Sequence, residues 1–134
     1  MVIETTNTLL VVILVLLSYF DFKLLKIPKC FIYLIYILRI ICPIPITIDN
    51  FISSIVFGLP FYLCYRFRAS IGYGDVLLIE ALCFYSGIQK SIMGIYYMGF
   101  VAFFFLCSLI LRRQSLEEHY PFVPIISIGF FLAL

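Results

Sequence analysis

Two aspartates stand at the edges of apolar runs. Asp21 closes the run that begins the chain, and Asp75 opens another run directly after Gly72-Tyr73-Gly74. Carboxylates in such places are costly to keep and are therefore candidate functional groups. Two carboxyls about 3 Å apart cannot both ionise cheaply, so they share one proton. The ionised one can take a proton from water while the protonated one polarises a peptide carbonyl, provided that the fold brings the two together.

Gly72 and Gly74 flank Tyr73 directly before Asp75. Glycine permits backbone conformations and close approaches that a Cβ would block. We expect an extended substrate to pass beside Asp75 along these glycines, and the sequence assigns no role to Tyr73.

The composition indicates the elements that must carry these groups. Of 134 residues, 65% are hydrophobic and only 12% are charged, which is typical of a membrane protein with several spans. We predict an all-α protein with a single membrane-embedded domain, residues 1–134. Six apolar runs are candidate membrane helices, at about 3–20, 31–47, 51–65, 76–92, 94–111 and 121–134.

The basic residues predict the orientation of these segments. Three breaks that alternate to one side hold seven of the nine Lys and Arg residues: Lys23, Lys26, Lys29, Arg66, Arg68, Arg112 and Arg113. By the positive-inside rule, that side is cytoplasmic and the N-terminus lies outside. The expected location is the cell (inner or plasma) membrane. Asp21 and Asp75 then share the cytoplasmic boundary, whereas Asp49 lies at the opposite one.

At these residues the sequence resembles the type IV prepilin peptidases, membrane aspartic proteases of the G-x-G-D class. The family's first Asp, followed by Ile-Pro-Asn, is matched by Asp21 and Ile27-Pro28-Lys29. Its G-x-G-D motif is matched by Gly72-Tyr73-Gly74-Asp75, and its late Pro-Phe-Gly-Pro resembles Pro121-Phe122-Val123-Pro124. The three landmarks occur in the family's order and cover nearly the whole chain.

The resemblance implies an aspartic endopeptidase that uses Asp21 and Asp75, with water as nucleophile and no cofactor. Its substrates would be type IV pilin-like membrane proteins, cut after a short basic leader at the cytoplasmic face. The remaining motif residues would bind substrate or shape the site: Gly72, Tyr73, Gly74, Pro28, Pro121 and Pro124. Three positions depart from the family pattern, Lys29 for Asn, Leu77 for Lys and Val123 for Gly.

The cysteines bear on a second activity. Many relatives carry a cytoplasmic loop with two C-x-x-C pairs and methylate the new N-terminus, whereas the five cysteines here are scattered singly. We therefore expect a peptidase without methyltransferase activity, similar to the short forms associated with Flp/Tad-type pili or competence pseudopili. With His119 as the only histidine, we expect no metal site.

Other charged residues leave alternatives open. Glu117 and Glu118 are candidate contacts for a basic leader, or belong to a solvated loop that balances neighbouring arginines. Glu80 and Arg39 lie inside apolar segments and are candidates for a structural polar contact with each other, or Glu80 faces substrate. A net charge of +2 does not indicate a nucleic-acid partner; membrane lipid is the expected surrounding.

Two rival functions remain. One is an intramembrane protease of the presenilin or signal-peptide-peptidase kind, in which the second aspartate would lie deeper. Arg66 and Arg68, close upstream of Asp75, favour a boundary site instead. The other rival is a membrane transport or assembly protein without enzymatic activity, which predicts that either aspartate tolerates replacement by Asn.

Overall fold

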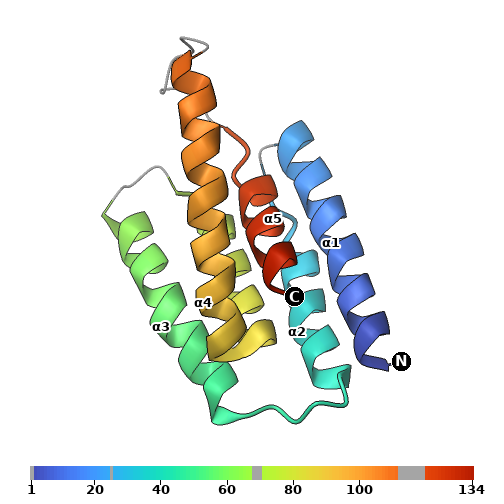
Figure 1. Ribbon diagram of the computed structural model, residues 1–134. Coiled ribbons are helices and arrows are strands. Elements are labelled where there is room, and N and C mark those ends of the chain that lie inside the picture. Colours follow the sequence, from blue (N-terminus) through green and yellow to red (C-terminus); the bar gives the residue numbers. More distant parts are fainter. Residues whose placement is uncertain (1, 25, 68–70, 112–119) are drawn as a thin grey trace.

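Five helices run roughly side by side in a bundle (Figure 1). The computed structural model describes residues 2–24, 26–67, 71–111 and 120–134. The helices are α1 (Val2–Leu24), α2 (Lys29–Ile41), α3 (Ile48–Arg66), α4 (Tyr73–Leu111) and α5 (Val123–Ala133). Within these ranges no strand occurs, so the all-α prediction is confirmed for the part of the chain that is described.

The helix α4 contains a sharp turn at Gly87. This residue has φ 75° and ψ 175°, a backbone conformation that is open almost only to glycine. The Ser91 hydroxyl donates to the Cys83 carbonyl over 3.3 Å. In a straight helix, residues eight apart would be separated by about 12 Å along the axis, so the chain must reverse between them.

The turn corrects one predicted boundary. The sequence placed a break between segments at about residue 93, after the polar Gln89 and Lys90, but the helical path is interrupted at Gly87. Backbone conformation, rather than polarity, decides where the chain turns here. Residues 88–92, expected to end one segment, instead begin the following one.

Three helices are long and apolar enough to cross a membrane among the described residues: Glu4–Leu24, Ile48–Arg66 and Tyr73–Leu111. The helices α2 and α5 have 13 and 11 residues, or about 20 Å and 16 Å, short of a hydrocarbon core of about 30 Å. Pro43 and Pro45 follow the end of α2 at Ile41 and cannot continue it. The predicted count of six membrane segments is therefore not confirmed.

The outer surface of the bundle is apolar. Large hydrophobic side chains such as Val15, Ile55 and Phe103 are more than half exposed, on α1, α3 and α4 respectively. Water does not tolerate a continuous surface of this kind, whereas lipid does. The helices that carry the two aspartates are therefore membrane helices.

Close packing joins α4 to α5. A Cβ placed on Gly129 of α5 would lie 2.6 Å from the backbone nitrogen of Met98 in α4, so the two backbones nearly touch. Small residues permit such contacts between membrane helices, where dispersion rather than water exclusion drives association. This contact fixes the position of α5 against the rest of the bundle.

Candidate functional site

Both aspartates lie near helix ends that point to the same end of the bundle: the end of α1, which is at the top in Figure 1, and the start of α4. Asp21 lies three residues before the end of α1, and Asp75 is the third residue of α4. Asp21 is only 6% exposed and Asp75 is partly buried. Although the two aspartates are far apart in the sequence, packing links their surroundings: Ile27, six residues after Asp21, contacts Gly74, which directly precedes Asp75.

The start of α5 holds the Asp21 side chain. Asp21 Oδ2 accepts a hydrogen bond of 3.0 Å from the amide of Val123, and the amide of Phe122 also donates to this carboxyl. The first amides of a helix lack partners within the helix, and a negative charge is favourable there. The late motif is thus brought onto Asp21. Because the backbone makes the contact, valine in place of the family's glycine leaves it intact.

The glycines before Asp75 have two different roles. The Gly72 amide donates to Asp75 Oδ2 over 3.2 Å, and a Cβ at position 72 would lie 3.1 Å from that oxygen. The carboxylate of Asp75 thereby caps the first turn of its own helix, as an acidic residue at the third helical position commonly does. The other carboxylate oxygen, Oδ1, makes none of the hydrogen bonds found among the described residues.

Gly74 packs against Ile27, which lies six residues after Asp21 in the sequence. A Cβ on Gly74 would lie 3.1 Å from both Cβ and Cδ1 of Ile27. Pro28 then precedes α2, and its carbonyl accepts the amide of Phe31 in the first turn of that helix. The Ile-Pro pair therefore positions the start of α4 as well as that of α2.

The remaining predicted site residues lie at the ends of different helices or outside the described residues. Tyr73 is exposed, and its ring packs against that of Tyr65 at the end of α3 (5.4 Å between centroids). Pro121 precedes α5, and Pro124 lies in its first turn. Glu117 and Glu118 lie outside the described residues.

Glu80 and Arg39 do not pair with each other among the described residues. Glu80 lies against Gly58 of α3, where its Cγ is 3.3 Å from the position a Cβ would take, and its charge acts on Tyr36 and Cys83. Its side chain therefore lies against α3.

Arg39 is 5% exposed and lies at the opposite end of the bundle, in the last turn of α2. It donates to the carbonyls of Ile44 and Pro45 over 3.0 and 3.2 Å, and to Asn50 Oδ1 over 3.2 Å. These bonds fasten the connection between α2 and α3. Because Arg39 is buried and donates to backbone carbonyls, we assign it a structural role. It lies about one helical turn beyond Tyr36 in α2, whereas Glu80 lies near Tyr36 itself.

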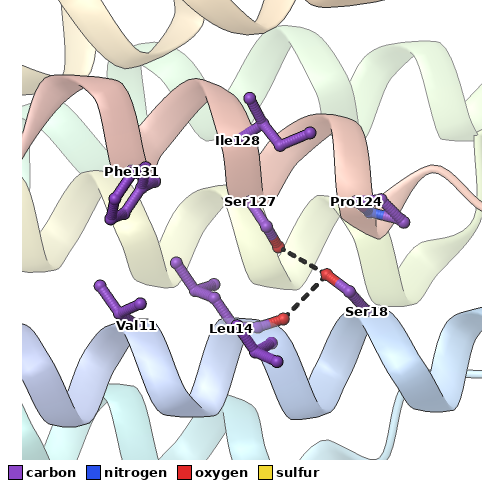
Figure 2. Close-up of a pocket in the computed structure, with 8 residues that line it drawn as sticks. Val11, Leu14, Ser18, Pro124, Ser127, Ile128 and Phe131 are labelled. Carbon is purple, nitrogen blue, oxygen red and sulfur yellow. Dashed lines mark hydrogen bonds between the residues drawn. The ribbon is translucent and has the colours of Figure 1, made fainter.

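A groove that the sequence did not predict runs between α1 and α5 (Figure 2). It has a volume of about 360 Å³ and is lined by Val11, Leu14, Val15, Ser18, Pro124, Ser127, Ile128 and Phe131. The hydroxyls of Ser18 and Ser127 are hydrogen bonded at 3.2 Å, and Ser18 also donates to the Leu14 carbonyl over 2.8 Å. Sequence alone offered no signal for it, since it depends on how two distant helices pack.

The described residues contain no group of three His, Cys, Asp or Glu side chains placed to hold a metal ion. The chemical groups that the site does present are two neighbouring carboxyls, one held by backbone amides and one partly open. Such a pair can exchange protons with a water molecule and with a carbonyl group.

Comparison with known proteins adds a family. The sequence model described as the type IV leader peptidase family matches residues 8–114, which is well over half of the chain and includes both aspartates. No curated protein and no solved structure matches the chain in the corresponding comparisons. The resemblance noted from the motifs is therefore confirmed by an independent match, and this chain belongs to the type IV leader peptidase family.

Proposed function

We propose that this protein is an aspartic endopeptidase that removes the leader from type IV pilin-like precursors, with Asp21 and Asp75 as its catalytic pair. Membership of a peptidase family supports peptide hydrolysis. The observation that carries the assignment of residues is the convergence at one end of the bundle: Asp21, Asp75, the Ile27 side chain on Gly74, and the Val123 amide on Asp21.

The proposed reaction uses one water molecule and no cofactor. The ionised carboxyl of the pair takes a proton from water while the protonated carboxyl donates a hydrogen bond to the scissile carbonyl oxygen. The resulting hydroxide adds to the carbonyl carbon. When the C–N bond breaks, the departing nitrogen takes a proton from the pair, which returns to its starting state with one proton shared. The two protons belong to the pair rather than to either residue alone.

Amide donors to Asp21 give the pair a fixed geometry. The bonds from Val123 and Phe122 hold one carboxyl in place, so it need not reorganise during the reaction. The partial exposure of Asp75 leaves room for substrate on the other side. We assign Asp21 to the anchored position of the pair and Asp75 to the side that meets substrate.

The proposed topology places this end of the bundle at the cytoplasmic face. Lys23 lies in the last turn of α1, Lys26 follows that helix, and Lys29 is the first residue of α2, so all three are at the same end as Asp21. Basic residues near a membrane boundary favour the cytoplasmic side. A basic leader in the cytoplasm would then reach the aspartates without crossing the membrane.

The place of both aspartates near helix ends favours this function over cleavage inside a membrane span. Asp21 lies near the last turn of α1 and Asp75 in the first turn of α4. An intramembrane protease needs its carboxyls within the hydrocarbon core. We therefore expect cleavage at the boundary, where a precursor's leader joins its membrane segment.

The test is cleavage of a co-expressed, epitope-tagged pilin-like precursor, followed as a mobility shift on a gel. We expect Asp21→Asn and Asp75→Asn each to lower the cleavage rate by at least about 100-fold, the usual contribution of a general acid or base. Asp49→Asn is the matched control, because Asp49 is exposed at the start of α3, at the opposite end of the bundle.

Each variant is also checked for expression and membrane insertion. If either Asp21→Asn or Asp75→Asn cleaves the precursor at the wild-type rate, the catalytic pair is ruled out and a non-enzymatic role for these residues is favoured. A loss caused equally by Asp49→Asn would show that the assay reports folding instead of catalysis.

A further inference from the structure

The groove between α1 and α5 leads toward the two aspartates. Ser18, at one end of the groove, lies three residues before Asp21 and so on nearly the same face of α1, about one turn away. Pro124 lines the same end of the groove and directly follows Val123, whose amide binds Asp21. Ser18 and Pro124 lie at the same end of the groove (Figure 2), so both walls end within a few residues of the Asp21–Val123 hydrogen bond.

The lining of the groove decides which chemistry it accepts. Six of the eight side chains are apolar, and the two serine hydroxyls are already hydrogen bonded, to each other and to a backbone carbonyl. No charged side chain lines it. An occupant must therefore be apolar and must bring no unpaired polar group into the groove.

The dimensions fit a short stretch of membrane helix. Along α1 the lining runs from Val11 to Ser18, and along α5 from Pro124 to Phe131, which is about 10 Å or two helical turns in each case. The α1 wall of the groove lies within the apolar span Glu4–Leu24, and its lining residues Val15 and Phe131 are 63% and 56% exposed. By contrast, two other cavities lie around Arg39 and Lys90 at the opposite end.

We propose that this groove is the docking site for the apolar membrane segment of the precursor, at the part directly after the bond that is cut. The inference rests on the proposed function. A membrane-protein substrate with a basic cytoplasmic leader must enter the membrane beside the aspartates, and this groove is the apolar surface continuous with them. Its membrane segment lies along α1 and α5, as an apolar helix does in a hydrophobic groove.

A photo-crosslinking experiment tests the occupant directly. A benzophenone amino acid replaces Val15, which lines the groove and is 63% exposed, in protein that also carries Asp75→Asn so that the precursor stays uncleaved. The same replacement at Val12 is the matched control, since Val12 is 49% exposed on the same helix but does not line the groove. The probe is a purified, epitope-tagged type IV pilin precursor in liposomes.

We expect crosslinks from position 15 to the first residues of the precursor's apolar segment, at several-fold higher yield than from position 12. Equal yields from both positions would overturn the proposal. Crosslinks from position 15 only to lipid, or only to a second copy of this chain, would overturn it as well and would assign the groove to that occupant.

A kinetic arm uses the active enzyme with Val15→Trp, which fills the groove from its exposed edge. We expect KM for the full precursor to rise about tenfold or more and kcat to change less, whereas Val12→Trp leaves both unchanged. An unchanged KM in Val15→Trp contradicts the docking site. If wild-type enzyme cleaves the precursor and the aspartate variants do not, such a failure concerns the groove alone; if wild-type enzyme does not cleave it, the proposed function fails.

Discussion

At the scale of single residues, the site is organised by backbone groups. Asp21 accepts amides from the start of α5, and Asp75 accepts the amide of Gly72 in its own first turn. Neither aspartate depends on a neighbouring side chain for these bonds. This explains how the departures from the family pattern at Lys29, Leu77 and Val123 leave the anchoring of the carboxyls unchanged.

The Asp21 side chain has a structural role that is separable from its proposed catalytic one. In Asp21→Asn the side-chain carbonyl oxygen still accepts the Val123 amide, whereas in Asp21→Ala that amide is left buried without a partner. We expect Asp21→Ala to lower the free energy of unfolding by about 1–3 kcal/mol, the cost of an unsatisfied buried donor, and Asp21→Asn to change it much less. Chemical unfolding in detergent measures both values.

Both variants should be inactive despite this difference. Equal stability of the Ala and Asn variants would argue against the bond to α5 in solution. Asp49→Ala, at an exposed position, controls for the general effect of removing a carboxylate.

Position 74 is expected to tolerate only glycine without a loss of activity, because a Cβ there would crowd Ile27. In Gly74→Ala the new Cβ would lie 3.1 Å from Ile27, so the start of α4 or the residue pair Ile27-Pro28 must shift by a few tenths of an ångström. We expect kcat for precursor cleavage to fall between a few-fold and about 100-fold, since a 1 Å misplacement of a catalytic group costs about the latter.

A second substitution checks the cause of that loss. Ile27→Ala removes the Cγ1 and Cδ1 atoms that the new methyl group meets but keeps the Cβ, so the double variant should recover part of the lost kcat. If the double variant is no faster than Gly74→Ala alone, the contact with Cγ1 and Cδ1 of Ile27 does not cause the loss of kcat.

At the scale of elements, the turn at Gly87 makes α4 act as two packed segments. With φ 75° and ψ 175°, any other residue there is strained by about 1–3 kcal/mol. We expect Gly87→Ala to reduce the free energy of unfolding by that amount. Gly99→Ala in the same helix is the control, because a Cβ at Gly99 meets nothing within 4 Å and alanine favours a helix.

Chemical unfolding of the two variants in the same detergent measures the difference. A Gly87→Ala protein as stable as the wild type would mean that the turn relaxes to another backbone conformation. In that case positions 83 and 91 would no longer lie close together. A disulfide between Cys83 and a cysteine introduced by Ser91→Cys, or a chemical crosslink, would then fail to form.

The elements also show what sequence can and cannot predict. Apolar runs and charges located the helices and placed Asp21 and Asp75 at one end, because both signals act locally along the chain. The sequence analysis did not predict the turn at Gly87, because the polar residues Gln89 and Lys90 indicate a boundary between segments further along the chain. The dipeptide Ser86-Gly87 is nevertheless common in turns. The short lengths of α2 and α5 were missed because apolar runs continue beyond the residues that are helical.

At the scale of the whole molecule, tertiary packing supplies what local patterns lack. The Val123 amide and the groove between α1 and α5 both depend on two helices that are about 100 residues apart in the sequence. The late Pro-Phe-Val-Pro motif was recognised as a pattern, but its contact with Asp21 could not be derived from spacing. Free amides at a helix start were the one physical signal that pointed to an acidic partner.

The bond between Val123 and Asp21 has a consequence for biogenesis. Asp21 is made before its partner amide, which follows 102 residues later in the sequence. During most of translation this carboxyl therefore lacks the group that orients it, even when α1 is already inserted in the membrane. A nascent chain halted before residue 123 would carry both aspartates and yet lack the amide that holds Asp21, so this part of the site can assemble only after the start of α5 has been made.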